Sequence, residues 1–173
     1  MEECTESEVQ RMLPLVPKWR QKQALQFHHT FGQYCCLKSW SMLQEIVVKL
    51  HRGSDPTCSF GEWEVGITQE GKPFFVAHPE VQFSISHCKE GIAVAVADCP
   101  IGIDIESTNR RALFEPEDGT DFHTWWTRME ALVKMRGTGI TDHWRETYLE
   151  EGEAVETYRP EGKKYVYSVA RKL

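Results

Sequence analysis

Apolar residues recur at helical spacing in the first third of the chain. Between Tyr34 and Leu50 they return every three to four residues, which predicts an amphipathic helix with one buried face: Leu37, Trp40, Leu43, Ile46, Val47 and Leu50. An earlier helix is expected over residues 19–30, with Pro17 near its start and Gly32 separating the two helices. Turn residues at 53–56 then predict a loop.

The middle of the chain changes to a strand-like pattern. A β-rich stretch at 63–67 precedes the turn sequence at 70–73, and Phe83, Ile85 and His87 alternate with serines. The continuous small apolar run at 92–97 predicts a strand buried on both faces. Residues 101–106 alternate again, which predicts a strand with one buried face.

The last third begins with a helix that has clear end signals. Asp121 is an expected N-cap, and Gly137 is the expected stop for a helix over residues 122–136. Three β-like stretches follow and complete the order helices, strands, helix, strands, which predicts the α+β class: residues 144–149, 154–159 and 165–170.

Composition is that of an ordinary globular protein. The 173 residues are 40% apolar and 27% charged, enough for one compact domain or two small halves. The net charge of −6 argues against a general nucleic-acid binder, and no apolar run is long enough to cross a membrane. The polar, acidic start predicts no signal peptide, and the six cysteines lack metal-site spacing. We therefore expect reduced thiols and a cytoplasmic protein.

Two carboxylates on one strand are the first candidate for chemistry. On a strand over 101–106, Asp104 and Glu106 point to one face, opposite three isoleucines. Their charges repel unless a cation lies between them, and carboxylate oxygens suit magnesium. Gly102 on the same face leaves space for a ligand to approach. The alternative is a solvent-exposed charged face with no function.

Two further patterns carry possible chemistry. Glu130 and Lys134 are one helical turn apart, which fits either a surface ion pair or a third metal ligand beside a phosphate-binding lysine. His87 follows Ser86 at a strand end and could donate hydrogen bonds to phosphate, or could be half-buried without function. No nucleophile-elbow motif surrounds the serines, so a hydrolase is not indicated.

The motifs occur together in a fixed order. Gly71-Lys72-Pro73 is followed by Phe83-Ser84-Ile85-Ser86-His87, by Ile101-Gly102-Ile103-Asp104-Ile105-Glu106, and by Trp126 through Glu130 to Lys134. Together they resemble the Sfp-type 4′-phosphopantetheinyl transferase superfamily, whose pattern is roughly G-K-P, F-N-x-S-H, G-x-D-x-E and W-x-x-K-E-x-x-x-K. Residues 19–50 also look like the N-terminal helices of that family.

The resemblance implies an α+β fold of two similar halves related by a pseudo-twofold axis, with coenzyme A in the cleft between them. The halves would be residues 1–99 and residues 100–173, and the second half would be shortened and would carry the magnesium ligands. Two family-like halves in one chain also imply a monomer.

The resemblance implies a role for each matching residue. Asp104, Glu106 and Glu130 match the magnesium ligands, and Lys134 matches the lysine near the transferred phosphate. The remaining matches concern coenzyme A: Ser86 and His87 hold its phosphates, Lys72 and Pro73 lie near its adenosine 3′-phosphate, and Lys18, Arg20, Lys22 and Lys38 are candidate N-terminal contacts.

The implied reaction is a magnesium-dependent transfer of the 4′-phosphopantetheine arm of coenzyme A to a serine of an apo acyl or peptidyl carrier protein. This holo-[acyl-carrier-protein] synthase activity would release 3′,5′-ADP, with Asp104, Glu130 and Lys134 as its catalytic residues. Magnesium and cationic side chains would neutralise the phosphates. The proton of the serine would pass to Glu130 or to a metal-bound water.

Three departures from the family pattern stand out. Met129 replaces a lysine, Ser84 replaces an asparagine, and the connection over 107–121 is too short for the extra helix that the family often carries there. A non-catalytic homologue that binds coenzyme A or a carrier protein without transfer is therefore an alternative. An unrelated α+β binding module with an acidic surface strand is a second alternative, which the joint order of the motifs disfavours.

Overall fold

The computed structural model describes residues 4–51 and 63–173, and for His51 the backbone alone. Cys58 and the loop predicted at 53–56 lie outside these residues. The density of contacts divides the chain into an N-terminal unit, Met1–Trp63, and a C-terminal unit, Glu64–Leu173. This division reflects compactness rather than internal symmetry, so the two halves related by a pseudo-twofold axis stay a prediction.

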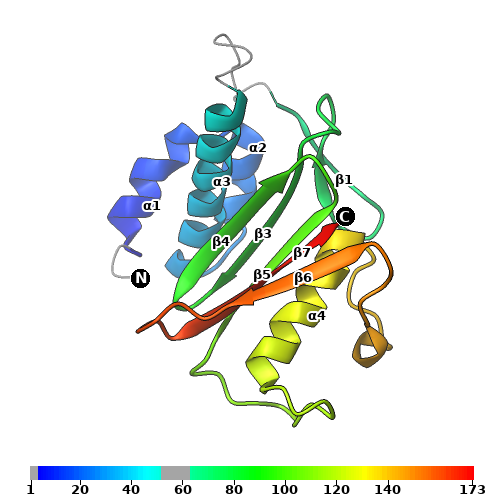
Figure 1. Cartoon of the computed structure of the whole chain (residues 1–173). Helices are drawn as coiled ribbons and strands as arrows, with labels where there is room; N and C mark the ends of the chain where they lie inside the picture. The colour runs from blue at the N-terminus through cyan, green and yellow to red at the C-terminus, as the bar shows by residue number, and fades with distance from the viewer. Residues whose placement is uncertain (1–3, 52–62) are drawn as a thin grey trace. The chain divides into compact units, whose positions relative to one another are not determined.

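Helices build the described part of the N-terminal unit (Figure 1). α1 spans Glu6–Met12, a 3₁₀ turn follows at Leu13–Leu15, and α2 and α3 span Lys18–Leu25 and Thr30–His51. Most of the predicted stripe on α3 is buried, including Leu37, Trp40 and Leu43. The interpretation of Gly32 as a separator is wrong, because α3 begins two residues earlier, at Thr30.

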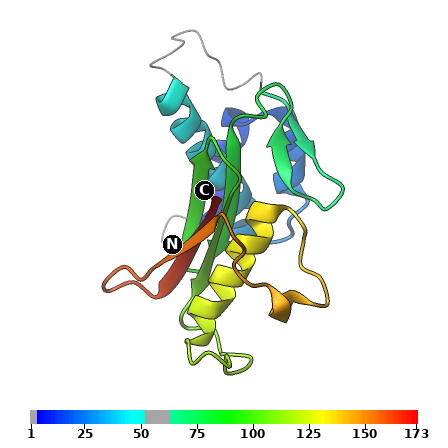
Figure 2. The same ribbon diagram turned by 45° about the vertical axis from the view of Figure 1, so that its right-hand side comes forward.

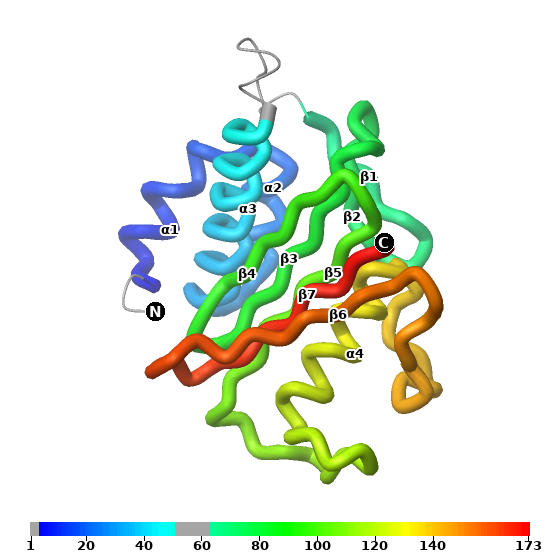
Figure 3. Tube along the Cα trace, viewed as in Figure 1, coloured from blue at the N-terminus to red at the C-terminus, as the bar shows by residue number. Residues whose placement is uncertain are grey.

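Antiparallel strands and one long helix build the C-terminal unit. The helix is α4, Phe122–Arg136, and a 3₁₀ turn lies at Trp144–Glu146. The strands form ladders β1–β2, β3–β4 and β5–β7–β6, with β7 between β5 and β6 (Figure 3). Their bounds are β1 Val65–Ile67, β2 Pro73–Phe75, β3 Gln82–Cys88, β4 Gly91–Ala97, β5 Ile101–Ser107, β6 Glu153–Tyr158 and β7 Tyr165–Lys172. The predicted α+β class is confirmed.

The predicted limits of α4 are confirmed by the capping interactions. The Asp121 side chain accepts hydrogen bonds from the backbone N–H groups of His123 and Thr124 at the start of the helix. Gly137 ends the helix with a φ of +72°, a conformation that glycine adopts without strain. These local signals fix the position of Glu130 and Lys134 along the helix.

Close approach of α4 to β5 corrects the interpretation of Gly102. Figure 2 shows α4 packed along the strands β5 and β7. A Cβ atom on Gly102 would lie deep inside van der Waals contact with the carbonyl oxygen of Ala131 and the backbone of Met135. The space beside Gly102 is therefore filled by the helix backbone, not left open for a ligand.

Serine hydroxyls join β3 to β5. The backbone N–H of Ile103 donates to Ser84 Oγ at 3.0 Å, and that of Ile105 donates to Ser86 Oγ at 3.4 Å. Both pairs have the same separation in sequence, so the two strands run parallel here. The side chains of β3 thus supply acceptors to β5 and hold the two strands in register.

Two predicted details of the C-terminal unit are wrong. Residues 144–149 do not form a strand, because Trp144 begins a 3₁₀ turn and packs against Phe114, Trp125 and Trp126. β4 is half-buried along its whole length rather than buried on both faces, since it pairs with β3 alone in its ladder. None of the helices within residues 4–51 or 63–173 is long and apolar enough to cross a bilayer.

Candidate active site

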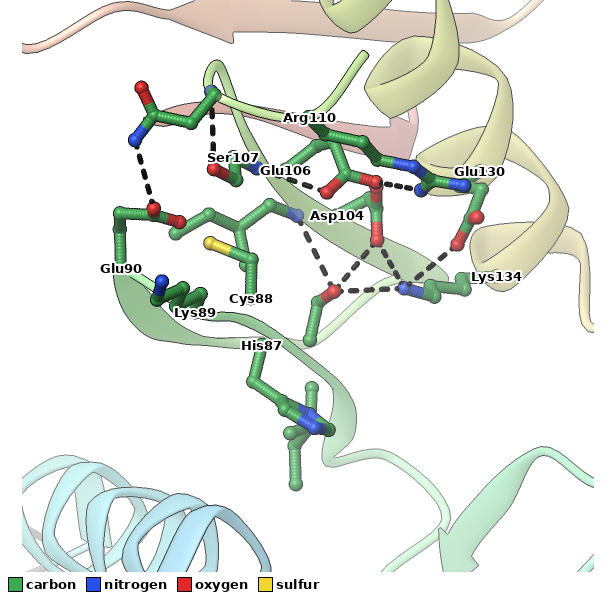
Figure 4. A pocket seen from close by; sticks show the side chains of 14 residues that line it. His87, Cys88, Lys89, Glu90, Asp104, Glu106, Ser107, Arg110, Glu130 and Lys134 are labelled. Carbon is green, nitrogen blue, oxygen red and sulfur yellow. Dashed lines mark hydrogen bonds and ion pairs between the residues drawn. The ribbon is translucent and has the colours of Figure 1, made fainter. Parts of the chain in front are cut away.

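The predicted metal ligands, together with Lys134, Ser86 and His87, line one pocket of about 730 Å³ in the C-terminal unit. We call it the carboxylate pocket. Asp104 and Glu106 come from β5, Glu130 and Lys134 come from α4, and Ser86 comes from β3. Figure 4 shows the side chains of the two acidic strand residues and the two helix residues converging on it. The fold therefore brings together residues that are up to 48 positions apart.

Lys134 is the centre of a hydrogen-bond network. Its Nζ atom lies 2.5 Å from Asp104 Oδ1 and 3.4 Å from Glu130 Oε2. The same ammonium donates to Ser86 Oγ at 3.1 Å, and Ser86 donates to Asp104 Oδ1 at 2.7 Å. The surface ion pair considered for Glu130 and Lys134 is thus part of a larger, mostly buried network.

Burial controls the charge state of this network. Asp104 is 4% exposed, and burial raises its pKa to about 6, while the nearby Lys134 ammonium opposes the rise and the Glu130 carboxylate adds to it. Lys134 is less buried, with 31% of its side chain exposed. Its ammonium can therefore serve both the buried Asp104 and an anion in the pocket.

Glu106 has a different partner from the other two carboxylates. Its Oε2 atom forms an ion pair with Arg110, which lies in the loop after β5 (Figure 4). Arg110 also lies over the Trp126 ring, with its Cζ 5.6 Å from the ring centroid. Sequence reasoning did not identify Arg110 as a pocket residue. The available signal was its position four residues after Glu106 in a loop that must turn back toward α4.

Ser86 and His87 leave β3 on opposite faces, as neighbouring strand residues do. The Ser86 hydroxyl donates to Asp104 and accepts from Lys134 and from the Ile105 backbone, which uses its full hydrogen-bonding capacity. His87 also lines the pocket, but its ring points away from Asp104 and Lys134 (Figure 4). Burial and the charge of Lys134 lower the pKa of His87, which favours a neutral ring.

Lys72 and Pro73 line a second pocket of about 260 Å³. This pocket shares Ile85, Glu130 and Lys134 with the carboxylate pocket, so the two adjoin along α4. Lys72 Nζ donates to the carbonyl oxygen of Met135 at 2.7 Å, and burial lowers its pKa. Lys72 therefore stabilises the C-terminal end of α4 in this structure.

The three departures from the family pattern have structural counterparts. Met129 is 2% exposed and belongs to the buried face of α4, so it contributes no charge to the pocket. Ser84 accepts the Ile103 N–H, which gives the residue a role in holding β5. Residues 108–121 form turns without a helix, and Phe114 within them packs against Phe122 and Trp125.

The predicted N-terminal cations lie in the N-terminal unit. Arg20 donates to the carbonyl oxygen of Cys36 at 2.8 Å and to Ser39 Oγ at 3.1 Å, and thereby holds α2 on α3. Lys18 and Lys22 are exposed, and Lys38 is half-buried.

The carboxylate pocket contains side chains whose chemistry suits magnesium binding. Asp104, Glu106 and Glu130 offer hard oxygen ligands of the kind that magnesium prefers. Their present arrangement is set by Lys134 and Arg110, which pair with them. Within the part of the chain that the structure describes, no group of three His, Cys, Asp or Glu side chains is close enough to hold a metal ion.

Comparison with known proteins gives three relatives with one activity in their names. A 4′-phosphopantetheinyl transferase of Bacillus subtilis is 28% identical over 153 residues, which are 78% of this chain and 66% of the relative. The 4′-phosphopantetheinyl transferase Sfp of Bacillus subtilis (strain 168) is 22% identical over 156 residues, or 79% of this chain and 67% of Sfp. The transferase psf-1 of Bacillus pumilus is 29% identical over 89 residues, or 41% of this chain and 38% of psf-1.

No family model matches the chain. The chain spans about two thirds of the length of the first two relatives, so a part of each has no counterpart in it. The matches nevertheless agree with the motifs on one family. The chain is similar to the Sfp-type 4′-phosphopantetheinyl transferases, and the resemblance indicated by its motifs is confirmed.

Proposed function

We propose that this protein transfers the 4′-phosphopantetheine arm of coenzyme A to a serine of an apo acyl or peptidyl carrier protein and releases 3′,5′-ADP. The observation that carries the proposal is the convergence of Asp104, Glu130, Lys134 and Ser86 in one pocket. The names of the relatives support a 4′-phosphopantetheinyl transferase activity in general.

Magnesium is the metal that the proposal includes. Asp104, Glu106 and Glu130 would hold it, because they are the three carboxylates of the pocket that match the family pattern. When bound, the ion would neutralise charge on the phosphates of coenzyme A. The proposal requires Lys134 and Arg110 to loosen their present pairing with these carboxylates.

Lys134 is suited to bind the phosphate that is transferred. Its flexible stem ends in a compact ammonium with three donors, two of which reach Asp104 and Ser86 in this structure. The ammonium is partly exposed to the pocket, so an anionic oxygen can approach it. As negative charge moves toward the leaving oxygen, a fixed cation stabilises it more than water does.

Glu130 is better suited than Asp104 to accept the proton of the carrier serine. Asp104 Oδ1 already accepts from both Ser86 and Lys134, whereas the contact of Glu130 with Lys134 is longer, at 3.4 Å. In the proposed step the serine oxygen forms a bond to the β-phosphorus of coenzyme A. The bond from that phosphorus to the bridging oxygen breaks, 3′,5′-ADP leaves, and the serine proton moves to the Glu130 carboxylate.

The decisive experiment follows the mass of the carrier. The protein is incubated with coenzyme A, magnesium and a panel of apo carriers from fatty acid, polyketide and peptide synthesis. We expect at least one carrier to gain the mass of one phosphopantetheine arm. The matched control omits coenzyme A, and an apo carrier with its acceptor serine changed to alanine must gain nothing.

A non-catalytic homologue is the second candidate, and one observation favours it. The cations Lys134 and Arg110 already pair with the pocket carboxylates, an arrangement that is stable without a metal. In this case coenzyme A would still bind, but no carrier in the panel would gain mass. A chain that neither binds coenzyme A nor modifies a carrier would contradict both candidates.

A further inference from the structure

Two cations that line the carboxylate pocket lie outside the motifs: Lys89, which is exposed in the turn between β3 and β4, and Arg110. Arg110 lies in the loop after β5, lines the pocket together with Lys134, and has 42% of its side chain exposed. We propose that Arg110 binds the diphosphate of coenzyme A. This inference rests on the proposed function, because it assigns a residue to the same substrate.

Four contacts hold Arg110 in place. Its carbonyl oxygen lies 2.8 Å from His123 Nε2 on α4, and its guanidinium both pairs with Glu106 and lies over the ring of Trp126. Its backbone N–H also donates to the carbonyl oxygen of Ser107, which closes the turn after β5. A side chain held in this way loses little conformational freedom when it binds a ligand.

The guanidinium has donors left for an anion. Arginine carries five N–H donors in a planar fork that matches two phosphate oxygens at once. In this structure Nη1 donates to Glu106, and the guanidinium makes no other hydrogen bond within residues 4–51 and 63–173. The exposed edge can therefore engage an anion, and the loosening of the pair with Glu106 that magnesium binding requires would free Nη1 as well.

The charge of the pocket also favours cations besides Lys134. Its walls carry the carboxylates of Glu90, Asp104, Glu106 and Glu130, which repel a diphosphate. Position 129, where the family pattern has a lysine, is a buried methionine, and the adjacent Arg128 is exposed and outside the pocket lining. Arg110 therefore supplies, from the loop, positive charge that α4 does not supply at position 129.

The test measures binding of coenzyme A by calorimetry, with magnesium and in parallel with a chelator. Arg110→Ala should weaken binding about tenfold or more, as expected for loss of a charge-assisted hydrogen bond. The affinity of Arg110→Lys should lie between those of the unaltered protein and Arg110→Ala, because lysine keeps the charge but lacks the planar fork of donors. Arg111→Ala is the matched control, since it removes the same charge from an exposed neighbour, and it should bind as the unaltered protein does.

A double-mutant cycle separates direct contact from a general change of charge. In the chelator, Glu106→Gln should strengthen binding of coenzyme A several-fold, because it removes a carboxylate that competes for Arg110. The gain should shrink in the Arg110→Ala background. An equal gain in both backgrounds would overturn the proposal, because Glu106 would then act on the ligand without Arg110.

The outcomes distinguish this inference from the proposed function. Weaker binding by Arg110→Ala, with no carrier modified by the unaltered protein, would support the role of Arg110 and contradict the transfer. Carrier modification with unchanged binding by both Arg110 variants would overturn the role of Arg110 alone. If the unaltered protein does not bind coenzyme A, both fail, and a melting curve for each variant identifies any loss of binding that comes from misfolding.

Discussion

Asp104 is a buried carboxylate that folding keeps at a cost. Burial raises its pKa to about 6, and Lys134 and Ser86 together compensate part of the lost hydration. For the stability of the folded protein alone, a leucine or valine at this position would be more favourable. The buried charge therefore points to chemistry in the pocket rather than to a contribution to folding.

Replacing Asp104 by asparagine should separate its effect on stability from its role in the chemistry of the pocket. Asparagine keeps an acceptor for Ser86 and Lys134, so the free energy of unfolding should change by no more than about 1 kcal/mol. The rate of carrier modification should fall on the order of a hundredfold, since a negative charge that organises the pocket is lost. Initial rates and thermal melting of Asp104→Asn measure both effects. The control is Asp98→Asn, an exposed aspartate, and near-normal transfer by Asp104→Asn would contradict the assignment.

A second buried carboxylate, Glu153, has the opposite pKa shift. Arg136 on α4 donates two hydrogen bonds to it, at 2.9 Å and 2.6 Å, and chiefly this contact lowers its pKa from 4.5 to about 2. A depressed carboxyl pKa stabilises the folded state above the unfolded pKa, and this contribution is lost as the pH falls from about 4.5 toward 2.

Glu153→Gln should reduce the slope of the free energy of unfolding against pH between pH 4.5 and 2. The unaltered protein should lose stability between pH 4.5 and 2 more steeply than the variant, by at most about 1.4 kcal/mol per pH unit for one proton. Denaturant unfolding at several pH values gives both slopes, and Asp104 titrates in both proteins, so its effect cancels. Glu156→Gln is the control variant, because it makes the same substitution at an exposed position of the same strand. Parallel curves for the unaltered protein and Glu153→Gln would count against the shift.

At the scale of elements, the contact of α4 with β5 determines the shape of the pocket. The contact depends on Gly102, because any side chain there would meet the helix backbone at Ala131 and Met135. Glu130 and Lys134 reach the strand carboxylates because the helix lies this close. A small increase in the distance between helix and strand would therefore act on stability and on the site together.

Gly102→Ala should destabilise the protein by roughly 2–4 kcal/mol and should reduce carrier modification even in the molecules that fold. The cost comes from moving backbone, which cannot be relieved by a rotamer change. Gly91→Ala is the matched control, since its Cβ would meet the flexible end of Ile105 at 3.1 Å. We expect it to change stability by about 1 kcal/mol or less. Chemical denaturation compares the two, and equal effects would argue against the close approach.

The elements differ in how far the sequence could predict them. The limits of α4 follow from Asp121 and Gly137, which act on their own neighbours in the chain. The role of Gly102 in packing, the serine contacts between β3 and β5, and the bond from Lys72 to Met135 each join segments distant in sequence. The sequence predicts a β-like stretch at 144–149, but the packing of Trp144 against Trp125 and Trp126 decides its conformation.

At the scale of the whole molecule, the candidate site lies within one of the two compact units. Every residue that lines the two pockets belongs to the C-terminal unit, Glu64–Leu173. The predicted N-terminal contacts belong to the other unit, and Arg20 among them is already engaged with Cys36 and Ser39. Binding of coenzyme A through the pockets should therefore act on the C-terminal unit directly.

Coenzyme A should stabilise the folded protein against heat. A ligand present at one hundred times its dissociation constant adds about 2.7 kcal/mol to the free energy of unfolding. For a chain of this size that corresponds to a rise in melting temperature of roughly 5–10 °C. Calorimetry should record a single shifted transition if the two units unfold together. If they unfold separately, the transition of the C-terminal unit should move and the other should not.

Removing magnesium is the informative comparison for this shift. If Asp104, Glu106 and Glu130 hold the ion together with coenzyme A, a chelator should reduce the rise in melting temperature, because the bare carboxylates repel the diphosphate. Lys134→Met should reduce the rise further, since it removes the cation that we propose to bind the transferred phosphate. A transferase and a non-catalytic homologue that binds coenzyme A both require the rise. If saturating coenzyme A does not raise the melting temperature, with or without magnesium, both hypotheses are excluded. The hypothesis then left to test is a protein that binds a carrier without coenzyme A.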